Sequence, residues 1–342
     1  MVCITDLSEA ELRVLRLALN RIAEDSSWDH QALTLEFSEI LELAPEIELE
    51  FTGFEIGEID TVLEDSLDQE DELPPIDSAS NPVTRPGDVW VLGDHLVLCG
   101  DALSDESYAR LLGNDKADMV FADPTNNLPT TDDVLGLGAV EHADFAIAGK
   151  LFSTGSVTFL QTSLGHAASY SVNGAIHFVC MDWPHAKELI TAAERIYSEW
   201  NDLCVWIDKN AGTGSLYESG HEHIFVFKVG TAPHVNKVSR GRSRRNRTNV
   251  WNYGSQTPVA TPTATKPVAM IADAIRDCSN RGGLILDPFA GVGTALIAAE
   301  RTRRRARLIE RDPMLVDVSI KRWQRLTGGA ARRADSGQLF RE

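Results

Sequence analysis

The chain has 342 residues, of which 51 are acidic and 32 basic, for a formal net charge of −19 at pH 7. Its content of 43% hydrophobic and 24% charged residues is that of an ordinary globular protein. The sequence contains no run of 18 uncharged apolar residues, so no membrane span is expected. The five cysteines form no C-x-x-C pair. This pattern favours reduced thiols in a cytosolic protein over a disulfide framework or a zinc site.

The negative charge is concentrated at the start of the chain. Residues 1–80 contain 22 of the acidic residues and 3 of the basic ones, which leaves equal numbers of both in residues 81–342. Apolar residues three or four apart predict helices over 7–43, and a turn with a third short helix is expected within 51–60. We therefore expect an acidic helical region over 1–64. It contains no basic stretch followed by an apolar run, so no secretory signal is expected.

The pattern then changes to a linker followed by short apolar runs. Residues 65–86 are acidic and then rich in Pro, Ser and Asn, which is typical of a linker. Two runs separated by Gly93-Asp94 predict a hairpin, and four later runs predict buried strands with a helix between two of them. The hairpin covers 89–92 and 96–98, the strands cover 119–122, 175–180, 203–207 and 223–228, and the helix covers 184–200. Residues 231–263 are not expected in the core. Alternating strands and helices predict an α/β sheet.

The C-terminal block is a strand, a glycine loop, a helix and a second strand, over 283–287, 288–293, 294–301 and 306–310. Gly291 and Gly293 allow the backbone to approach a ligand closely. Glu310 ends the second strand, where an acid that binds a ribose is expected. An ordinary glycine turn in a βαβ unit is the alternative. Only two strands fit after Gly283, so upstream strands must complete the sheet, and the strand order must be permuted.

Asp287 at the start of this loop indicates what the loop binds. A carboxylate there would repel the pyrophosphate of a dinucleotide. It suits a nucleoside whose other end carries an ammonium group. S-adenosyl-L-methionine has an ammonium group, a sulfonium group and a ribose diol, so it is the expected cofactor.

A second loop, Asp123-Pro-Thr-Asn126, follows the predicted strand at 119–122, and ligands bind at the carboxyl ends of such strands. Together the two loops make residues 87–326 similar to the permuted (beta-group) DNA amino-methyltransferases, which carry D-P-P-Y and then D-P-F-x-G-x-G-T. Residues 287–294 match the second motif completely. The fold that the resemblance implies is α/β, a Rossmann-like methyltransferase sheet in permuted order.

The resemblance also implies roles for individual residues. Cofactor contacts are expected from Asp101, Lys266, Asp287, Phe289, Gly291, Gly293, Thr294 and Glu310, and the catalytic loop is Asp123, Pro124, Thr125 and Asn126. In the family the target base leaves the duplex. The Asp side chain and the next carbonyl accept hydrogen bonds from its exocyclic amine, and an aromatic ring stacks on the base. The implied activity is S-adenosylmethionine-dependent DNA methylation, with adenine N6 favoured because Asp123 stands where the cytosine group usually has Ser.

The catalytic loop differs from the family's pattern. Thr125 replaces the second proline, and Asn126 replaces the aromatic residue. Loss of a stacking ring costs about 1–3 kcal/mol, which is roughly a fivefold to 150-fold loss of base binding. The element before Lys266-Pro267 is also altered. The alternatives are a working or weakened methyltransferase with an aromatic ring from elsewhere, and a catalytically decayed homologue that binds DNA or cofactor without turnover. Methylation of RNA or a small molecule is a weaker alternative.

Basic residues are clustered between the two loops. Six of them, Lys237, Arg240, Arg242, Arg244, Arg245 and Arg247, lie within 11 residues, which suits contact with DNA phosphates. The alternative is a solvated loop. Residues 231–263 are therefore the expected target-recognition insert. A second cluster over 301–307 is interpreted as a solvated helix end, and His221 and His223 are expected to pack on a strand, with no metal.

The N-terminal segment resembles the helical C-terminal part of ParB-like domains, without their upstream catalytic element. It is a poor DNA-binding surface, so a solvated appendage is expected; a partner contact and an intramolecular shield over the basic segment are the rivals. The expected domains are 1–64, a linker over 65–86, the methyltransferase over 87–328 and a tail over 329–342. The expected partner is double-stranded DNA, with a homodimer as an open hypothesis and no membrane. The resemblance implies a cytoplasmic, bacterial or phage-encoded protein of the restriction-modification kind.

Overall fold

The structure is a computed structural model that describes residues 7–22, 30–44, 47, 49–54, 59, 62, 74, 81–124, 154–212, 217, 219–238, 248–253 and 265–341. The chain divides into two compact units, with a boundary after Asp71. Within the described ranges, no helix is long and apolar enough to cross a membrane.

The N-terminal unit contains two helices, α1 (Glu9–Ile22) and α2 (His30–Leu43), and the 3-10 helix η1 (Leu49–Thr52). Ser8 and Glu11 form a reciprocal capping box at the start of α1, in which each side chain accepts the other's backbone N–H. The regularly spaced apolar residues of these helices, including Val14, Leu17 and Phe37, pack together in a small core. The two predicted helices over 7–43 are therefore confirmed.

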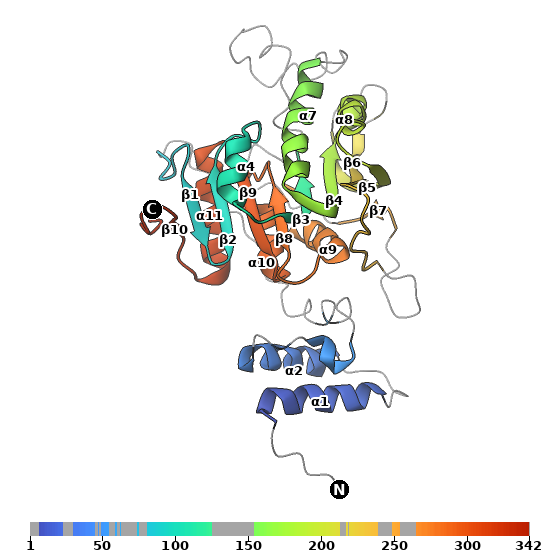
Figure 1. Ribbon diagram of the computed structural model, residues 1–342, viewed down its shortest axis with the longest axis vertical. Coiled ribbons are helices and arrows are strands. Elements are labelled where there is room, and N and C mark those ends of the chain that lie inside the picture. The colour runs from blue at the N-terminus through green and yellow to red at the C-terminus, as the bar shows by residue number, and fades with distance from the viewer. Residues whose placement is uncertain are drawn as a thin grey trace. The chain divides into compact units, whose positions relative to one another are not determined.

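The second unit is built on a ten-stranded sheet with the order β10-β1-β2-β9-β8-β3-β4-β6-β5-β7 among the described residues (Figure 1). Strands β2 (His95–Cys99), β9 (Arg305–Glu310), β8 (Leu284–Asp287), β3 (Ala117–Ala122) and β4 (Ser171–Met181) are parallel neighbours. Antiparallel strands β6 (Ser219–Lys228) and β5 (Glu199–Gly212) follow. Upstream strands thus complete the sheet around β8 and β9.

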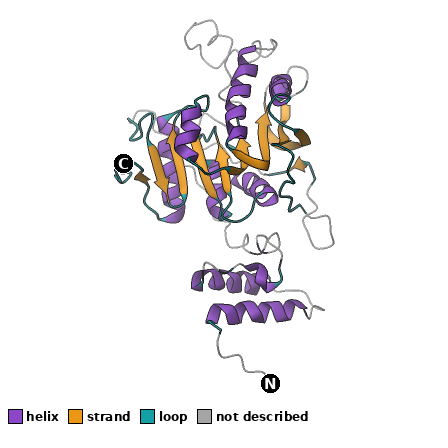
Figure 2. Cartoon of the chain, in the orientation of Figure 1, coloured by secondary structure: helices purple, strands orange, loops and turns teal. Residues whose placement is uncertain are grey.

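Helices cover both faces of this sheet (Figure 2). One face packs against α9 (Val268–Cys278), α10 (Thr294–Arg301) and α11 (Pro313–Thr327), and the other packs against α4 (Asp105–Leu112), α7 (Thr154–Ser169) and α8 (Ala186–Ala193). Side chains of β3 alternate between them, with Met119 and Phe121 on the first face and Val120 on the second. This alternation follows from the two-residue period of a strand. The α/β prediction is confirmed.

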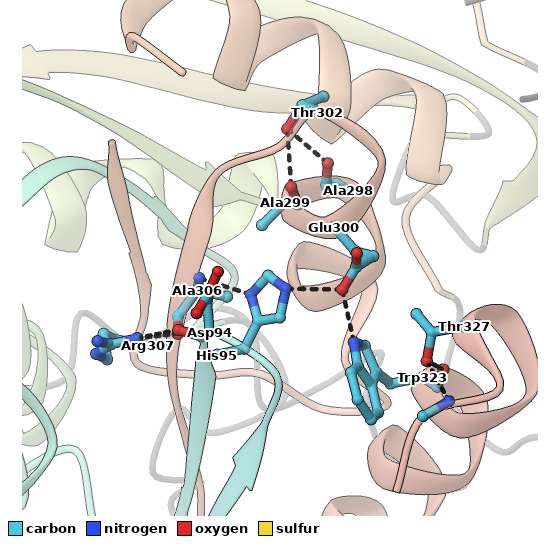
Figure 3. A network of polar contacts seen from close by, with 11 residues as sticks. Asp94, His95, Ala298, Ala299, Glu300, Thr302, Ala306, Arg307, Trp323 and Thr327 are labelled. Atoms are coloured by element: carbon cyan, nitrogen blue, oxygen red, sulfur yellow. Dashed lines mark hydrogen bonds and ion pairs between the residues drawn. The ribbon is translucent and has the colours of Figure 1, made fainter. Parts of the chain in front are cut away.

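A polar network holds the hairpin to the C-terminal helices (Figure 3). His95 Nδ1 accepts a hydrogen bond from the Ala306 N–H at 2.9 Å, so its Nε2 carries the proton and donates to Glu300 Oε2 at 2.9 Å. Trp323 Nε1 donates to the same oxygen at 2.7 Å. The bond from His95 lowers the pKa of Glu300. Strands β2 and β9 and helices α10 and α11 are thereby joined by satisfied buried groups.

The predicted hairpin is confirmed as β1 (Val89–Leu92) and β2, and the four predicted strands are present as β3 to β6. The helix predicted over 184–200 is wrong at its end. It follows the 3-10 helix η3 (Trp183–His185) and stops at Ala193, and Glu199 already belongs to β5. Residues from Glu199 onward pair with β6 as a strand, so tertiary contacts override the helical pattern of the sequence.

Two other boundaries differ from the sequence prediction. The short strand β7 (Val250–Trp251) lies within the segment that was expected outside the core, and it pairs with β5 and buries Trp251. At the C-terminus, β10 (Arg332–Arg333) pairs with β1, and Phe340 packs edge-on against Trp90 with ring centroids 5.3 Å apart. At the other end, the backbone N–H groups of Val83 and Thr84 donate to Asp317. Both ends of the predicted methyltransferase domain therefore continue into packed structure.

Candidate active site

The carboxyl ends of the parallel strands bring four acidic residues to one edge of the sheet. Asp101 follows β2, Glu310 ends β9, Asp287 ends β8 and Asp123 follows β3. Ligands of open α/β sheets bind outside this edge. Residues far apart in the sequence are therefore collected on one side of the fold.

A cavity of about 500 Å³ lies at this edge, within the range of roughly 300–1,000 Å³ that is common for small-molecule sites. Its polar lining includes Asp123, Lys266, Asp287 and Glu310. The other lining residues are Phe121, Thr265, Ile271, Phe289, Ala290, Gly291, Val292, Thr294, Arg311, Asp312, Pro313 and Leu315. Asp123 of the predicted catalytic loop thus shares one cavity with six of the predicted cofactor residues, namely Lys266, Asp287, Phe289, Gly291, Thr294 and Glu310.

The glycine loop has the backbone that its sequence requires. Gly291 and Gly293 have φ values of +52° and +77°, in the left-handed region that favours glycine. A Cβ on Gly293 would lie 2.7 Å from Ser319 Oγ, whereas one on Gly291 would meet open space. Gly293 therefore allows α10 to pack close to α11, and Gly291 leaves the cavity open.

Glu310 closes the loop from the neighbouring strand. Its Oε2 accepts a hydrogen bond from the Gly291 N–H at 2.7 Å, and its Oε1 accepts one from the Asp312 N–H at 2.8 Å. Burial raises the pKa of Glu310 despite these two bonds. Each carboxylate oxygen has a second lone pair, so the group that holds the loop also has acceptor capacity for a diol.

Asp287 is the most strongly perturbed acid of the cavity. It is 6% exposed, and its Oδ1 accepts a hydrogen bond from the Phe289 N–H at 2.9 Å. Burial raises the pKa of Asp287 to about 8, against the effect of that bond, and the charges of Asp123 and Glu310 act in the same direction as burial. A buried acid of this kind ionises readily only beside a cation, so the position selects a positively charged ligand group.

Lys266 lines the cavity and contacts two acidic side chains. Its Nζ lies 2.6 Å from Asp123 Oδ2 and 2.9 Å from Glu222 Oε2, and it stands over the Trp206 ring at 5.7 Å from the centroid. Burial works against its charge, yet Asp123 and Glu222 hold the pKa of Lys266 well above its usual value. Lys266 is therefore a buried cation between two carboxylates.

Glu222 was missed by the sequence analysis, although a signal was present. Along β6, Glu222 has the same parity as Ile224 and Val226, which both belong to the core beside α9 and α10. A carboxylate in phase with buried side chains predicts a buried charge that needs a partner. The flanking histidines drew attention instead. Their rings, on the other face of the strand, are 4.9 Å apart.

The structure gives other predicted residues different settings. Asp101 is exposed, its Oδ1 accepts a hydrogen bond from the Leu103 N–H at 2.9 Å, and the described lining of the cavity does not include it. Thr125 and Asn126 lie outside the described residues, as do Arg240, Arg242, Arg244, Arg245 and Arg247. Lys237 is described, and its ammonium nitrogen is buried. Such a nitrogen is not placed to contact a phosphate.

The interpretation of residues 301–307 as a solvated helix end is wrong for two arginines. Arg304 is 2% exposed and donates to the Thr302 and Ser279 carbonyl oxygens, and Arg307 is 8% exposed and donates to the Asp94 carbonyl oxygen. These guanidinium groups satisfy loop carbonyls. Among the described residues, no group of three His, Cys, Asp or Glu side chains is arranged to hold a metal ion.

The cavity fits the expected cofactor on its own chemistry. A buried acid that needs a cation lies at one end of the loop, a carboxylate with remaining acceptor capacity lies on the next strand, and the backbone between them has no Cβ at Gly291. Apolar side chains of Phe289, Ile271 and Leu315 line the rest. An ammonium group, a diol and an aromatic base are each matched by one of these parts.

Comparisons with known proteins agree with this chemistry. A family model described as DNA methylase, of the N6/N4 methyltransferase type, matches residues 117–321. The chain is 34% identical over 128 residues to the type II methyltransferase M.Cfr9I of Citrobacter freundii, and 27% identical over 128 residues to M.XycI of Xanthomonas campestris pv. cyanopsidis. Each alignment covers 35% of this chain and 43% of the relative, so the chain matches less than half the length of these relatives.

The fold has a solved counterpart. The structure of the PvuII DNA methyltransferase, which is described as cytosine-N4-specific, superposes with a TM-score of 0.54 at 13% identity. The match covers 72% of this chain and 94% of that one. At this identity the likeness concerns the fold alone.

Proposed function

The chain belongs to the N6/N4 DNA methylase family, and from that premise we propose that it transfers a methyl group from S-adenosyl-L-methionine to an exocyclic amine of a DNA base. The observation that carries the proposal is the shared cavity. Asp123, the expected acceptor of the amine hydrogen bonds, lines the same cavity as Asp287 and Glu310, the expected cofactor ligands. Donor and acceptor would therefore meet without rearrangement of the sheet.

The cofactor would be held by the glycine loop and the two acids beside it. S-adenosyl-L-methionine supplies an electrophilic methyl group on its sulfonium when it is bound. Asp287 would pair with the ammonium group, and Glu310 would accept hydrogen bonds from the ribose hydroxyls while its bond to the Gly291 N–H keeps the loop in place. Phe289 and Leu315 would exclude water from the apolar part of the ligand.

Asp123 and the Pro124 carbonyl would orient the base. Both are acceptors at the end of β3, where an amine that donates two hydrogen bonds presents its lone pair away from them, toward the cofactor. Lys266, 2.6 Å from Asp123 Oδ2, stabilises the ionised carboxylate that such acceptance requires. Adenine N6 is the favoured target because of Asp123, and cytosine N4 is the alternative.

We further infer that Trp183 supplies the aromatic surface that Asn126 lacks. Strand β4 is the parallel neighbour of β3, with Ala122 opposite Val179, so residues just beyond the ends of both strands lie at the same edge. Trp183 stands two residues beyond the end of β4 and is 49% exposed. Asp182 caps its 3-10 turn by accepting the His185 N–H. An exposed ring on a capped turn at this edge suits stacking on an extruded base.

Contact with the DNA backbone is proposed for the arginines at positions 240, 242, 244, 245 and 247, within the insert proposed for target recognition. The division of the chain into an acidic helical unit, a linker and a methyltransferase domain, and the ParB-like origin of the first unit, also remain proposals. For that unit, a solvated appendage, a contact with a partner and an intramolecular shield over the basic segment are open alternatives, and a homodimer is a separate hypothesis. The equal numbers of acids and bases in residues 81–342 pose no electrostatic objection to DNA.

The second candidate function is a decayed homologue that binds cofactor or DNA without turnover, and the altered pair Thr125 and Asn126 favours it. Tritiated S-adenosyl-L-methionine and duplex DNA separate the two. Transfer of label by the wild-type protein supports the enzyme. Cofactor binding without transfer, restored by the double variant Thr125→Pro and Asn126→Tyr, supports decay. Absence of cofactor binding would contradict the enzyme, and absence of both cofactor and DNA binding would contradict both candidates.

A further inference from the structure

Two charged side chains that line the cavity, Asp123 and Lys266, form a compact cluster with Glu222, and the charges of this cluster do not balance. Asp123 and Glu222 share the single ammonium group of Lys266, at 2.6 and 2.9 Å. The side chains of Asp123, Glu222 and Lys266 are 19%, 18% and 8% exposed. With both acids ionised, this set carries one net negative charge away from bulk water. Such a charge is costly unless a proton or a cationic ligand group compensates it.

Glu222 is the member of the set that can take up the proton. One carboxylate oxygen, Oε2, contacts Lys266, while Oε1 is buried and has no hydrogen-bond partner among the described residues. A carboxylate oxygen buried without a donor is the natural place for a proton. In agreement, burial raises the pKa of Glu222 to about 7, although Lys266 acts to lower it.

On β5, the residue that pairs with Glu222 is Trp206, which does not titrate. The titratable neighbours of Glu222 come from the other elements around it and from its own strand. They are Lys266 before α9, Asp123 after β3, Asp182 after β4, and His221 and His223 on its own strand. Asp123 and Asp182 act in the same direction as burial, and Lys266 alone opposes them. The thiol of Cys180 on β4 has its own pKa raised well above the usual value by burial, so it adds no charge near neutrality.

Resting on the proposed function, we propose that Glu222 is a positioning residue of the active site, which ties the Lys266 ammonium against Asp123 and sets the net charge of this cluster by gaining or losing a proton. In the ionised state the cluster keeps a negative charge beside the position where the amine becomes cationic. In the protonated state it is neutral. The ionised state is therefore the active one.

The first test needs no ligand and uses the full chain. Glu222→Gln keeps the shape of the side chain and its contact with Lys266, but the glutamine amide does not titrate. Because the folded carboxyl has a raised pKa, proton uptake stabilises the wild type at low pH, and this stabilisation is lost as pH rises toward 7. We expect equal melting temperatures for wild type and Glu222→Gln at pH 5, and a melting temperature about 2–4 °C higher for the variant at pH 8.

Glu199→Gln is the matched control. Glu199, on β5, also pairs with a lysine, Lys228, but its side chain is 53% exposed and the hydrogen bond from Lys228 lowers its pKa. We expect its melting temperature to remain within about 1 °C of wild type at both pH values. If Glu222→Gln loses the same stability at pH 5 and pH 8, the carboxyl does not exchange a proton in this range and the proposal is overturned.

The second test is the pH profile of methyl transfer at saturating S-adenosyl-L-methionine, where a change of cofactor affinity caused by Asp287 does not alter the rate. The wild-type rate should fall below about pH 7, as Glu222 takes up its proton, while Glu222→Gln should be about tenfold slower at pH 8 and lack this acid limb. An unchanged acid limb in the variant would overturn the role in the reaction. A wild type that transfers no methyl group at any pH would refute the proposed function instead, and the melting experiment would still decide whether Glu222 titrates.

Discussion

The two sides of the cavity differ in how the chain builds them. The cofactor side is one continuous segment, β8 to β9, in which the Phe289 N–H donates to the Asp287 carboxylate and the Gly291 N–H donates to the Glu310 carboxylate. The acceptor side is assembled from Asp123, Lys266 and Glu222, and its central contact joins residues 143 positions apart. The cofactor side therefore depends on one local motif. The acceptor side depends on residues from separate parts of the chain, and its buried charges are present although the loop after Asp123 differs from the family's pattern.

The largest expected effect is a loss of methyl transfer without a loss of cofactor binding. Asp123→Asn removes the charge that accepts the amine hydrogen bonds, so methyl transfer should fall by about 10²–10⁴-fold. Binding of S-adenosyl-L-methionine by calorimetry should persist, because the glycine loop does not depend on Asp123. Asp105→Asn, in the exposed first turn of α4, is the control. Equal loss of binding and transfer in Asp123→Asn would contradict the division into two sides.

A second prediction concerns the acceptor side alone. Trp183→Ala should weaken binding to duplex DNA that carries a mismatched target base by roughly fivefold to 150-fold, the range for one lost stacking contact. Trp183→Phe should recover much of this loss. Trp200→Ala is the matched control, since Trp200 is also 49% exposed but lies on β5. Equal effects of the two alanine variants would remove Trp183 from the proposed site.

A third prediction concerns the cofactor side alone. Burial raises the pKa of Asp287 to about 8 in the ligand-free protein, and an ammonium group would lower it. Cofactor binding at pH 7 should therefore release close to one proton, and affinity should rise by up to about tenfold per unit between pH 6 and 7. Calorimetry in buffers of different ionisation enthalpy measures this release. Asp287→Asn should bind weakly and release none; proton release equal to wild type would show that another group titrates.

The smallest effects come from the paired glycines of the loop. Gly293→Ala places a Cβ 2.7 Å from Ser319 Oγ at a left-handed φ, so the free energy of unfolding should decrease by about 1–3 kcal/mol. Gly291→Ala meets open space on the cavity side and should cost about 1 kcal/mol of stability from its φ while weakening cofactor binding. Chemical denaturation and calorimetry measure the two effects. A reversed order of stability would contradict the loop geometry.

How much the sequence predicts follows the same division. The strand, loop, helix and strand at 283–310 carry local signals, namely short apolar runs, paired glycines and an acid at the strand end, and the structure places them as predicted. Lys266 was expected to contact the cofactor. Its contacts with Asp123 and Glu222 depend on the pairing of β3, β4 and β6, which no local pattern encodes.

The errors have the same origin. The helical pattern at 184–200 extends into β5 because its end is decided by pairing with β6. In the sequence, Arg304 and Arg307 belong to a basic cluster that is typical of a solvated surface. In the structure they are buried and donate to carbonyl groups of distant turns. In each case the decisive partner is remote in the chain.

The central claim is that this cavity methylates a DNA base amine with Asp123 as the acceptor-side group. The most direct measurement is to express this one gene in a host that lacks DNA methylation and to sequence the modified bases. We predict N6-methyladenine at a fixed sequence context with the wild-type gene and none with Asp123→Asn. Unmodified DNA from a host that contains folded, cofactor-binding wild-type protein would contradict the claim.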